Sequence, residues 1–458
     1  MLPIEQACYW LAHRAPLDPT PLEGAREVEV AIVGAGFTGL WTALFLKDLR
    51  PSLAVAVVEQ GCVAYGASGR NAGMLSETID HSHGLAIEHF GEAEARQLAR
   101  LGELNVAELA QFLERHQLRC DYEATGRLMV ALTPAQVQEC RRTVDIARHL
   151  GLDSFRLLDQ AETRAEVSSP LYLGGVHVTG GGILDPVKLA DGLRGEAERS
   201  GVRIYEQSRV RAVERAGGGV RVRTEAGHLD ARRAVLAASA YTHHLLPGIS
   251  RRFIPLYDYI LVSDPLTSQQ HAAIGWRNRQ GVTDGRTFFN YYRLTTDNRI
   301  LWGTSEATYY RRNRVDPSCD HSPAHYQALR ASFRRHFPTL SKLEFPYAWG
   351  GAICSTTRLT PFFGRALDGR VLYGLGYTGH GLGTTRLAGQ ILAHLALDLP
   401  SELLDLALVR KQPFPYPPEP LRSWSVALVT RALRKVDRGE SPSLLLRLLD
   451  RMGLGFSS

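Results

Sequence analysis

Two short apolar runs near the start of the chain are separated by an amphipathic stretch. Residues 28–33 and 54–58 are rich in Val, Ile and Ala, which predicts two buried strands. Residues 40–47 carry apolar side chains at helical spacing, and a glycine-rich turn, residues 34–39, joins the first strand to this helix. Strand, glycine turn, helix and strand in this order predict a βαβ unit of an α/β domain.

The glycine turn has the pattern that binds a pyrophosphate. Gly34 permits a tight turn, Gly36 lets backbone amides approach a phosphate, and Gly39 lets the helix pack closely on the strand. The N-terminus of the helix then faces the negative charge. Glu59 ends the second strand about 20 residues after the last glycine, where a carboxylate accepts hydrogen bonds from ribose hydroxyls and repels a 2′-phosphate. This segment predicts a dinucleotide site that disfavours NADP.

A second strand, turn and helix occurs late in the chain. Residues 371–376 predict a strand, residues 377–383 a glycine-rich turn and residues 384–395 a helix. Such a turn presents backbone amides and the positive end of a helix dipole, which suits negative charge on the N1/O2 edge of a reduced flavin. The alternative is a simple loop between strand and helix.

The middle of the chain predicts two groups of strands. A helix that begins after Asp185-Pro186 is followed by short strands at residues 202–205, 210–213, 220–222 and 234–238. The glycines at 217–219 lie between two of these strands and indicate a hairpin turn, so the chain has one dinucleotide fingerprint. Alternating aromatic runs at residues 251–265, 288–293 and 300–303 predict a large antiparallel sheet.

Composition narrows the classes of function. The 458 residues include 44% hydrophobic and 22% charged residues, as in an ordinary globular protein of about two domains. The net charge of +6 comes from basic residues spread along the chain, so nucleic acid is not expected as a partner. The six cysteines stand far apart, which predicts no metal site and a reducing, cytoplasmic setting. Neither a signal peptide nor a membrane span is expected.

Residues 67–74 carry a family signature. Their sequence, Ala-Ser-Gly-Arg-Asn-Ala-Gly-Met, resembles the S-G-R-N-x-G motif of the D-amino-acid oxidase/glycine oxidase superfamily and looks most like its gamma-glutamylputrescine oxidoreductase branch. Little side-chain bulk lets backbone amides close over a flat ring or a phosphate, whereas a flexible surface loop is the alternative. The resemblance extends from residue 24 to roughly residue 400 and implies FAD as the cofactor.

The sequence patterns and the resemblance together predict a set of FAD-binding residues in several separate segments. They are Gly34, Gly36, Phe37, Thr38, Gly39, Glu59, Ser68, Gly69, Arg70, Asn71, Ala72, Gly73, Met74, Val210, Ala238, Gly376, Gly379, His380, Gly381, Leu382 and Gly383.

The resemblance also implies how the domains are organised. The fold class is α/β, with a discontinuous Rossmann-type FAD-binding domain and an α+β substrate domain on a large, mostly antiparallel sheet. The FAD-binding domain is expected at residues 24–84, 165–245 and 346–400, and the substrate domain at residues 85–164 and 246–345. Residues 401–458 are expected to form a proline-rich connector and a helical C-terminal tail that caps the body.

In the resembling enzymes the antiparallel sheet covers the isoalloxazine ring and holds the substrate. The residues that this makes candidates for substrate binding are Tyr257, Tyr259, Tyr292 and Arg293. Core packing is the alternative for each aromatic side chain. No arginine stands where amino-acid oxidases keep one for the substrate carboxylate, so Arg358 or Arg293 replaces it, or the substrate lacks an α-carboxylate.

The catalytic residues stay open. Arg293 and His380 are the candidates, although a histidine between two glycines also suits a spacer whose amide alone matters. His81 and His83 have no acidic or cysteine partners at ligand spacing, which is typical of solvated loop residues.

Two departures from the family bear on the cofactor. Some members attach FAD through a cysteine near residues 349–361, but the matching position here is Ile353 rather than Cys354, so we expect non-covalent FAD. Some sarcosine-type oxidases activate oxygen with a lysine, and none stands in the corresponding strand near Trp302. The electron acceptor, O2 or another, is therefore open.

The resemblance implies an enzyme that oxidises a C–N bond in a small amine or amino acid. Hydride passes to flavin N5, the imine is hydrolysed to an aldehyde or keto acid, and reoxidation by O2 gives H2O2. The alternatives are a dehydrogenase of the same fold with another acceptor, a 2-hydroxy acid oxidase, and a flavin-binding subunit without catalysis.

Overall fold

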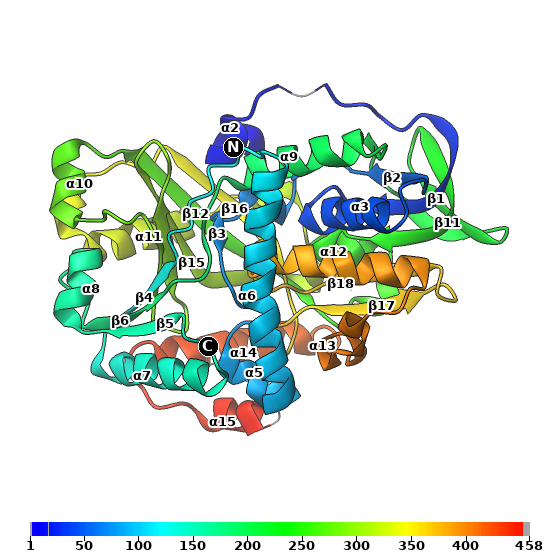
Figure 1. Cartoon of the computed structure of the whole chain (residues 1–458). Coiled ribbons are helices and arrows are strands. Elements are labelled where there is room, and N and C mark those ends of the chain that lie inside the picture. Colours follow the sequence, from blue (N-terminus) through cyan, green and yellow to red (C-terminus); the bar gives the residue numbers. More distant parts are fainter. Residues whose placement is uncertain (1, 17, 452–458) are drawn as a thin grey trace.

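Two large sheets form the framework of the molecule, and they lie side by side in Figure 1. The computed structural model describes residues 2–16 and 18–451, so residues 452–458 of the predicted tail lie outside it. Each large sheet has eight strands, and β3 (Met74–Leu75) pairs with β7 (Gly182–Ile183) in a small third sheet. The architecture is the α/β fold that the sequence predicts.

The first sheet contains the predicted βαβ unit. Five of its strands are mutually parallel and follow the order β18, β11, β1, β2, β8, while β17 pairs antiparallel with β18 at one edge. Residues 217 and 218 form the predicted hairpin turn between β9 and β10. The strands are β1 (Gly24–Val33), β2 (Val55–Val58), β8 (Arg203–Tyr205), β9 (Ala212–Ala216), β10 (Gly219–Arg223), β11 (Gly227–Leu236), β17 (Phe362–Ala366) and β18 (Val371–Leu375).

The second sheet is the predicted antiparallel sheet. Its order is β16, β12, β15, β14, β13, β4, β6, β5, and within the described residues the pairing is antiparallel except between β13 and β4. The strands are β4 (Arg127–Ala131), β5 (Phe155–Leu158), β6 (Gly174–Val178), β12 (Ile254–Pro265), β13 (Gly281–Asp284), β14 (Asn290–Leu294), β15 (Arg299–Tyr309) and β16 (Tyr347–Ser355).

Helices cover the sheets and connect them. In Figure 1 the long helix α6 crosses in front of the junction between the sheets, and α3 and α12 lie against the first sheet. The described helices are α1 (Ile4–Ala7), α2 (Tyr9–Ala12), α3 (Phe37–Leu49), α4 (Ala67–Arg70), α5 (His83–Phe90), α6 (Glu92–Arg115), α7 (Pro134–His149), α8 (Gln160–Glu166), α9 (Pro186–Arg199), α10 (Ser268–Ile274), α11 (Pro323–His336), α12 (Gly381–Leu397), α13 (Ala407–Arg410), α14 (Leu421–Val436) and α15 (Leu444–Arg451).

Sheet membership differs from the expected domain boundaries at two strands. Residues 165–245 and 346–400 are expected in the FAD-binding domain, yet β6 and β16, which lie within these ranges, belong to the second sheet. β6 pairs with β4 and β5, and β16 pairs with β12 along nine residues. The sheet to which a strand belongs depends on partners that are distant in sequence. Composition alone therefore could not show whether β6 and β16 pair in the first sheet or in the second.

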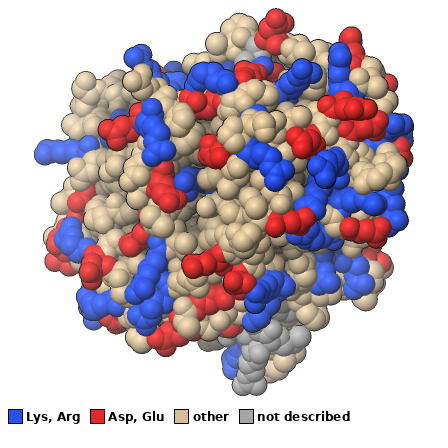
Figure 2. Space-filling view, turned by 45° about the vertical axis from the view of Figure 1, so that its right-hand side comes forward, with Lys and Arg blue, Asp and Glu red and all other residues tan. Residues whose placement is uncertain are grey.

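The surface charges and the helices can be compared with the expectations of no nucleic-acid partner and no membrane span. On the face shown in Figure 2, basic and acidic side chains are interspersed. Across residues 2–16 and 18–451, no helix has the length and apolar character needed to cross a membrane.

Gly389 lies where α12 packs on α3, and an added Cβ there would lie 2.6 Å from Trp41 Cβ and 2.8 Å from the Thr42 backbone nitrogen. Gly389→Ala therefore overpacks this contact and is expected to lower the free energy of unfolding by about 1–3 kcal/mol in urea denaturation. Gly195→Ala in α9 is the matched control, because the added Cβ meets only the Arg199 side chain at 3.5 Å. This control should be neutral or stabilising by up to about 1 kcal/mol; equal effects of the two variants would contradict the packing argument.

Candidate active site

One cavity of about 890 Å³ joins the predicted cofactor segments to the predicted substrate sheet. Its lining comes from the turn after β1, the end of β2, α4 and the turn before α12 on one side. On the other side it comes from one face of β12 and from β13, β14, β15 and β16. The two halves of the predicted site therefore face each other across a single space.

Most of the predicted FAD-binding residues line this cavity. They are Gly34, Gly36, Phe37, Thr38, Glu59, Ser68, Arg70, Asn71, Ala72, Met74, Val210, Ala238, Gly379, His380, Gly381, Leu382 and Gly383. Four predicted glycines do not line it, namely Gly39, Gly69, Gly73 and Gly376. An added Cβ at these four would lie 1.9, 2.4, 2.1 and 2.5 Å from a neighbouring atom, so close packing of the chain requires glycine there.

The first glycine turn and Glu59 have the expected geometry. Gly34 has a φ of +107°, and an added Cβ would lie 2.7 Å from the Ala237 carbonyl oxygen. The buried carboxylate of Glu59 accepts hydrogen bonds from the backbone amides of Ala35 at 2.9 Å and Gly61 at 3.0 Å. Burial raises the pKa of Glu59, and these two amides oppose that rise.

The Ser-Gly-Arg-Asn segment is a short helix tied to the first turn. The Phe37 amide donates to Ser68 Oγ at 2.9 Å, and the Gly73 amide donates to Asn71 Oδ1 at 2.8 Å. Arg70 is 4% exposed and forms an ion pair with Asp320 at 2.8 Å. Its Nη2 atom is buried without a hydrogen-bond partner, although the residue lines the cavity.

The second glycine turn leaves the N-terminus of α12 open toward the cavity. No side chain caps α12, and Thr385 Oγ1, in its first turns, is buried without a partner. His380 contacts His81 edge to face, with ring centroids 4.9 Å apart. Burial lowers the pKa of His380 well below the usual value, so the imidazole is neutral at physiological pH.

His81 and His83 are not solvated loop residues, which corrects the sequence interpretation. Burial lowers the pKa of each to about 4, and His81 lines the cavity beside His380. The signal that could have located them was their position between two cofactor segments.

These features fit FAD. Two helix N-termini open onto the cavity, a buried carboxylate follows β2, and unpartnered donors at Arg70 and Thr385 line the space. A dinucleotide needs amides for its pyrophosphate, a carboxylate for its ribose and donors for the oxygen and nitrogen atoms of the flavin. The residues on the cofactor side supply each of these groups.

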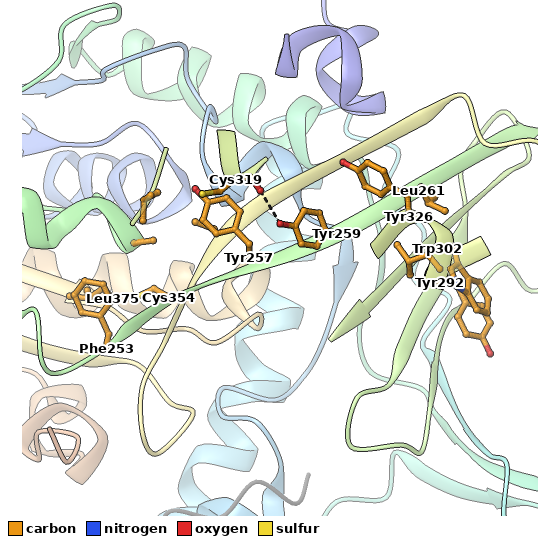
Figure 3. Close-up of a cluster of buried hydrophobic side chains, with 14 of the residues drawn as sticks. Phe253, Tyr257, Tyr259, Leu261, Tyr292, Trp302, Cys319, Tyr326, Cys354 and Leu375 are labelled. Carbon is orange, nitrogen blue, oxygen red and sulfur yellow. Dashed lines mark hydrogen bonds between the residues drawn. The ribbon is translucent and has the colours of Figure 1, made fainter. Parts of the chain in front are cut away.

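The tyrosines predicted to bind substrate lie on the wrong face of the second sheet. Tyr257, Tyr259 and Tyr292 are at most 1% exposed and belong to the hydrophobic core shown in Figure 3. Tyr259 donates to the Cys319 carbonyl oxygen at 2.9 Å, and Tyr292 stacks on Trp302 with centroids 4.3 Å apart. Strand side chains alternate between faces, so these tyrosines point away from the cavity and the alternative of core packing is correct.

Neither predicted arginine reaches the cavity. Arg293 is 1% exposed, and its Nη1 atom donates to the carbonyl oxygens of Gly73 at 2.8 Å and Leu184 at 2.6 Å. Arg358 donates to the carbonyl oxygens of Leu408 and Lys411. Both side chains bind backbone carbonyls away from the cavity, so neither is placed to be a substrate ligand or a catalytic group.

Asp258 and Tyr291 occupy the cavity face instead. Tyr291 Oη donates to Asp258 Oδ2 at 2.5 Å, and the Tyr259 amide donates to Asp258 Oδ1 at 2.6 Å. The Tyr291 ring lies over Gly303, where an added Cβ would come within 2.2 Å of the ring. Asp258 is the one acidic residue among apolar neighbours in residues 254–262, and this was the signal in the sequence.

The electrostatics of this pair are set by burial. Burial raises the pKa of Asp258 to about 7, although the hydrogen bond from Tyr291 opposes the rise. The pKa of Tyr291 is raised far above its usual value, so the phenol stays a neutral donor. Asp258 and Glu59 are the acidic residues of the described cavity lining, and Glu59 is on the nucleotide side. Asp258 is therefore the carboxylate available to a substrate.

The cavity also bears on how FAD is held. Ile353 and Cys354 of β16 both belong to its lining, but the Cys354 side chain is 3% exposed and packs in the core of Figure 3. Burial raises the pKa of the Cys354 thiol well above its usual value, which keeps it from reacting as a thiolate. The described lining residues include no lysine.

Comparison with known sequences identifies relatives along most of the chain. The sequence model of the family described as DAO, FAD dependent oxidoreductase, matches residues 29–395. Gamma-glutamylputrescine oxidoreductase of Escherichia coli is 30% identical over 83% of this chain and 86% of its own. The probable oxidoreductase OrdL of Haemophilus influenzae is 29% identical over 82% of this chain and 84% of its own.

Solved structures share the fold at lower identity. Glycine oxidase from Geobacillus kaustophilus superimposes with a TM-score of 0.70 at 20% identity, covering 84% of this chain and 99% of that protein. L-proline dehydrogenase from P. horikoshii gives 0.68 at 18% identity, covering 83% and 96%.

Glu59→Gln removes the charge that accepts hydrogen bonds from two backbone amides and that is predicted to accept those of the ribose hydroxyls. The dissociation constant of FAD, measured by fluorescence titration of the apoprotein, should rise about 10-fold to 100-fold, the usual effect of losing hydrogen bonds to a charged group. Glu29→Gln is the matched control, since Glu29 also accepts from a backbone amide, that of Ala54, but outside the cavity. A similar dissociation constant for both variants would refute the role of Glu59.

Proposed function

The chain belongs to the DAO family of FAD-dependent oxidoreductases, and from this premise we propose that it oxidises the C–N bond of a small amine. It is an FAD enzyme that acts on amines or amino acids. The observation that carries the finer proposal is the Asp258–Tyr291 pair, because it places one carboxylate on the substrate side of the cavity.

The arginines favour an amine without an α-carboxylate. Four arginines line the cavity within the described residues. Arg70, Arg127 and Arg211 already have carboxylate partners in Asp320, Glu77 and Glu225, and Arg209 stands next to Val210 in the segment predicted to bind FAD. An α-amino acid would need a cation free to receive its carboxylate. A simple ammonium group needs one acceptor, and Asp258 supplies it. The relative named gamma-glutamylputrescine oxidoreductase supports an amine as substrate.

Asp258 has a second task in this proposal. An ammonium group cannot lose hydride from its carbon until the nitrogen has lost a proton, and Asp258 Oδ2 accepts that proton. Tyr291 keeps the carboxylate oriented through its hydrogen bond. FAD, when bound, would accept the hydride, which carries both electrons of the oxidation. Water then hydrolyses the imine to an aldehyde and ammonia or an amine.

The test of this function is anaerobic reduction of the purified holoenzyme. We expect absorbance near 450 nm, the approximate position of the flavin band, to bleach with amines and to persist with D-amino acids, L-amino acids and 2-hydroxy acids. Admitting air then separates an oxidase, which recovers its colour and forms H2O2, from a dehydrogenase. Acid precipitation should release the FAD, because it is held non-covalently. Bleaching by 2-hydroxy acids alone, or by no substrate, would overturn the proposal.

Asp258→Asn tests the residue itself. The loss of a proton acceptor should lower kcat/KM for amines by about 10²-fold to 10⁴-fold. In the wild type, kcat/KM should rise as the pH passes about 7, because the carboxylate ionises above its raised pKa. Above pH ~10 the wild type should lose activity, because it binds the ammonium form of the amine. The variant should lack the rise near pH 7 and should instead gain activity near pH ~10, where the amine itself becomes neutral.

Asp264→Asn is the matched control for that variant, since Asp264 is exposed near the end of the same strand. It should keep both the rate and the pH profile. Retention of the rise near pH 7 in Asp258→Asn would assign that ionisation to another group.

A further inference from the structure

Helix α14 forms part of the cavity lining although it lies beyond the family match, which ends at residue 395. It follows the proline-rich connector and lies at the bottom of Figure 1 with α15. Its cavity-facing residues recur at helical spacing along one side, and they are Ser425, Val426, Val429, Thr430 and Leu433. The opposite side is solvent-exposed at Trp424 and Leu428.

Polar contacts hold both ends of α14 to the second sheet. Before the helix, the Glu419 carboxylate accepts from Tyr309 Oη at 2.7 Å and from the Arg312 amide at 3.0 Å. After it, the Asp437 carboxylate accepts from the amides of Thr287 at 2.7 Å and Phe288 at 2.9 Å.

The last turn of the helix is fixed as well, because Arg434 forms an ion pair with Glu306 of β15 at 2.6 Å. These contacts lie at both ends of the helix. The valines of α14 are therefore held in place over the cavity rather than resting there by packing alone.

The space beneath α14 is apolar and continues from the Asp258–Tyr291 pair. Tyr291 lies over Gly303, and Tyr257 and Tyr259 pair with Thr308 and Thr304, so Ser305 and Ala307 of β15 line the cavity beside Asp258. Phe288 and Phe289 line it from the segment before β14. Among the described lining residues of this compartment, the polar groups are hydroxyls and none is charged.

We infer that α14 is the specificity element of the active site and that its apolar face holds the non-reacting end of the substrate. This inference rests on the proposed oxidation of amines and names the class: primary amines with an uncharged alkyl or aryl substituent. The amino group binds Asp258 and Tyr291, and the substituent extends over β15 toward Val426 and Val429. A second charged group at the far end would lose its hydration without gaining a partner.

The experiment compares matched amines on the anaerobic holoenzyme. Affinity is measured from the change that each amine causes in the flavin spectrum, and reduction is measured separately from bleaching. From ethylamine to hexylamine, affinity should increase about threefold to fourfold per methylene buried, at ~0.8 kcal/mol each. Hexylamine should bind about tenfold or more tightly than 1,5-diaminopentane, which has nearly the same length but a second charge.

Two substitutions at one position test the part that α14 plays. Val429→Phe fills the compartment and should lower affinity and kcat/KM for hexylamine about tenfold, while ethylamine is unaffected. Val429→Asp places a carboxylate there and should reverse the preference toward 1,5-diaminopentane. Leu428→Phe is the control, because Leu428 is 55% exposed on the outer side of the same helix and should leave both amines unchanged.

The outcomes separate this inference from the proposed function. Two results would overturn the role of α14 even if amines bleach the flavin. One is an affinity that does not depend on the length of the alkyl chain of the amine. The other is an equal effect of Val429→Phe and Leu428→Phe on the affinity for hexylamine. Binding that follows chain length without bleaching would overturn amine oxidation and keep the apolar compartment. No binding of any amine would overturn both.

Discussion

The alternation of side chains along β12 is the constraint on which the substrate side of the molecule depends. Tyr257 and Tyr259 are buried in the core on the side of the second sheet that faces away from the cavity, where their hydroxyls donate to the carbonyl oxygens of Asp316 and Cys319. Because successive residues of a strand point to opposite faces, burial of the two tyrosines turns Asp258 toward the cavity. A carboxylate there is costly unless it is hydrogen-bonded or has a function. Tyr291 provides one hydrogen bond, and in the proposed function a bound ammonium group would provide the opposite charge.

The nucleotide side could be predicted from the sequence because its signals are local. The glycines that begin at Gly34, the acid at Glu59 and the turn before α12 each act through backbone geometry within a few residues. Even the predicted glycines outside the cavity lining are explained by close contacts of the chain. The family signature at residues 67–74 lies in the same cavity. Recognition of FAD therefore required no knowledge of how distant strands pair.

The substrate side could not be predicted in the same way, because the face of a strand depends on its distant partners. An aromatic run shows that a strand is present, but the packing of α11 decides which side chains become core. Arg293 illustrates the same limit: its charge suggested a substrate ligand, whereas it binds the carbonyls of Gly73 and Leu184, more than a hundred residues away. The amphipathic pattern of the tail predicted its helices, but not that α14 would face the cavity.

In the proposed reaction, the apolar compartment and the Asp258 carboxylate would both favour loss of the same proton, that of the substrate ammonium group. Burial raises the pKa of Asp258 to about 7, whereas an alkyl ammonium group in water has a pKa near ~10.4, so proton transfer from a solvated ammonium group to this carboxylate would cost about 5 kcal/mol. In a compartment closed by Val426 and Val429, burial of the ammonium group would cost several kcal/mol more, while the neutral amine carries no such cost. An uncharged substituent that excludes water therefore favours the neutral amine, the form from which hydride can leave. Substrate choice by α14 and proton transfer to Asp258 are in this way two effects of one desolvation.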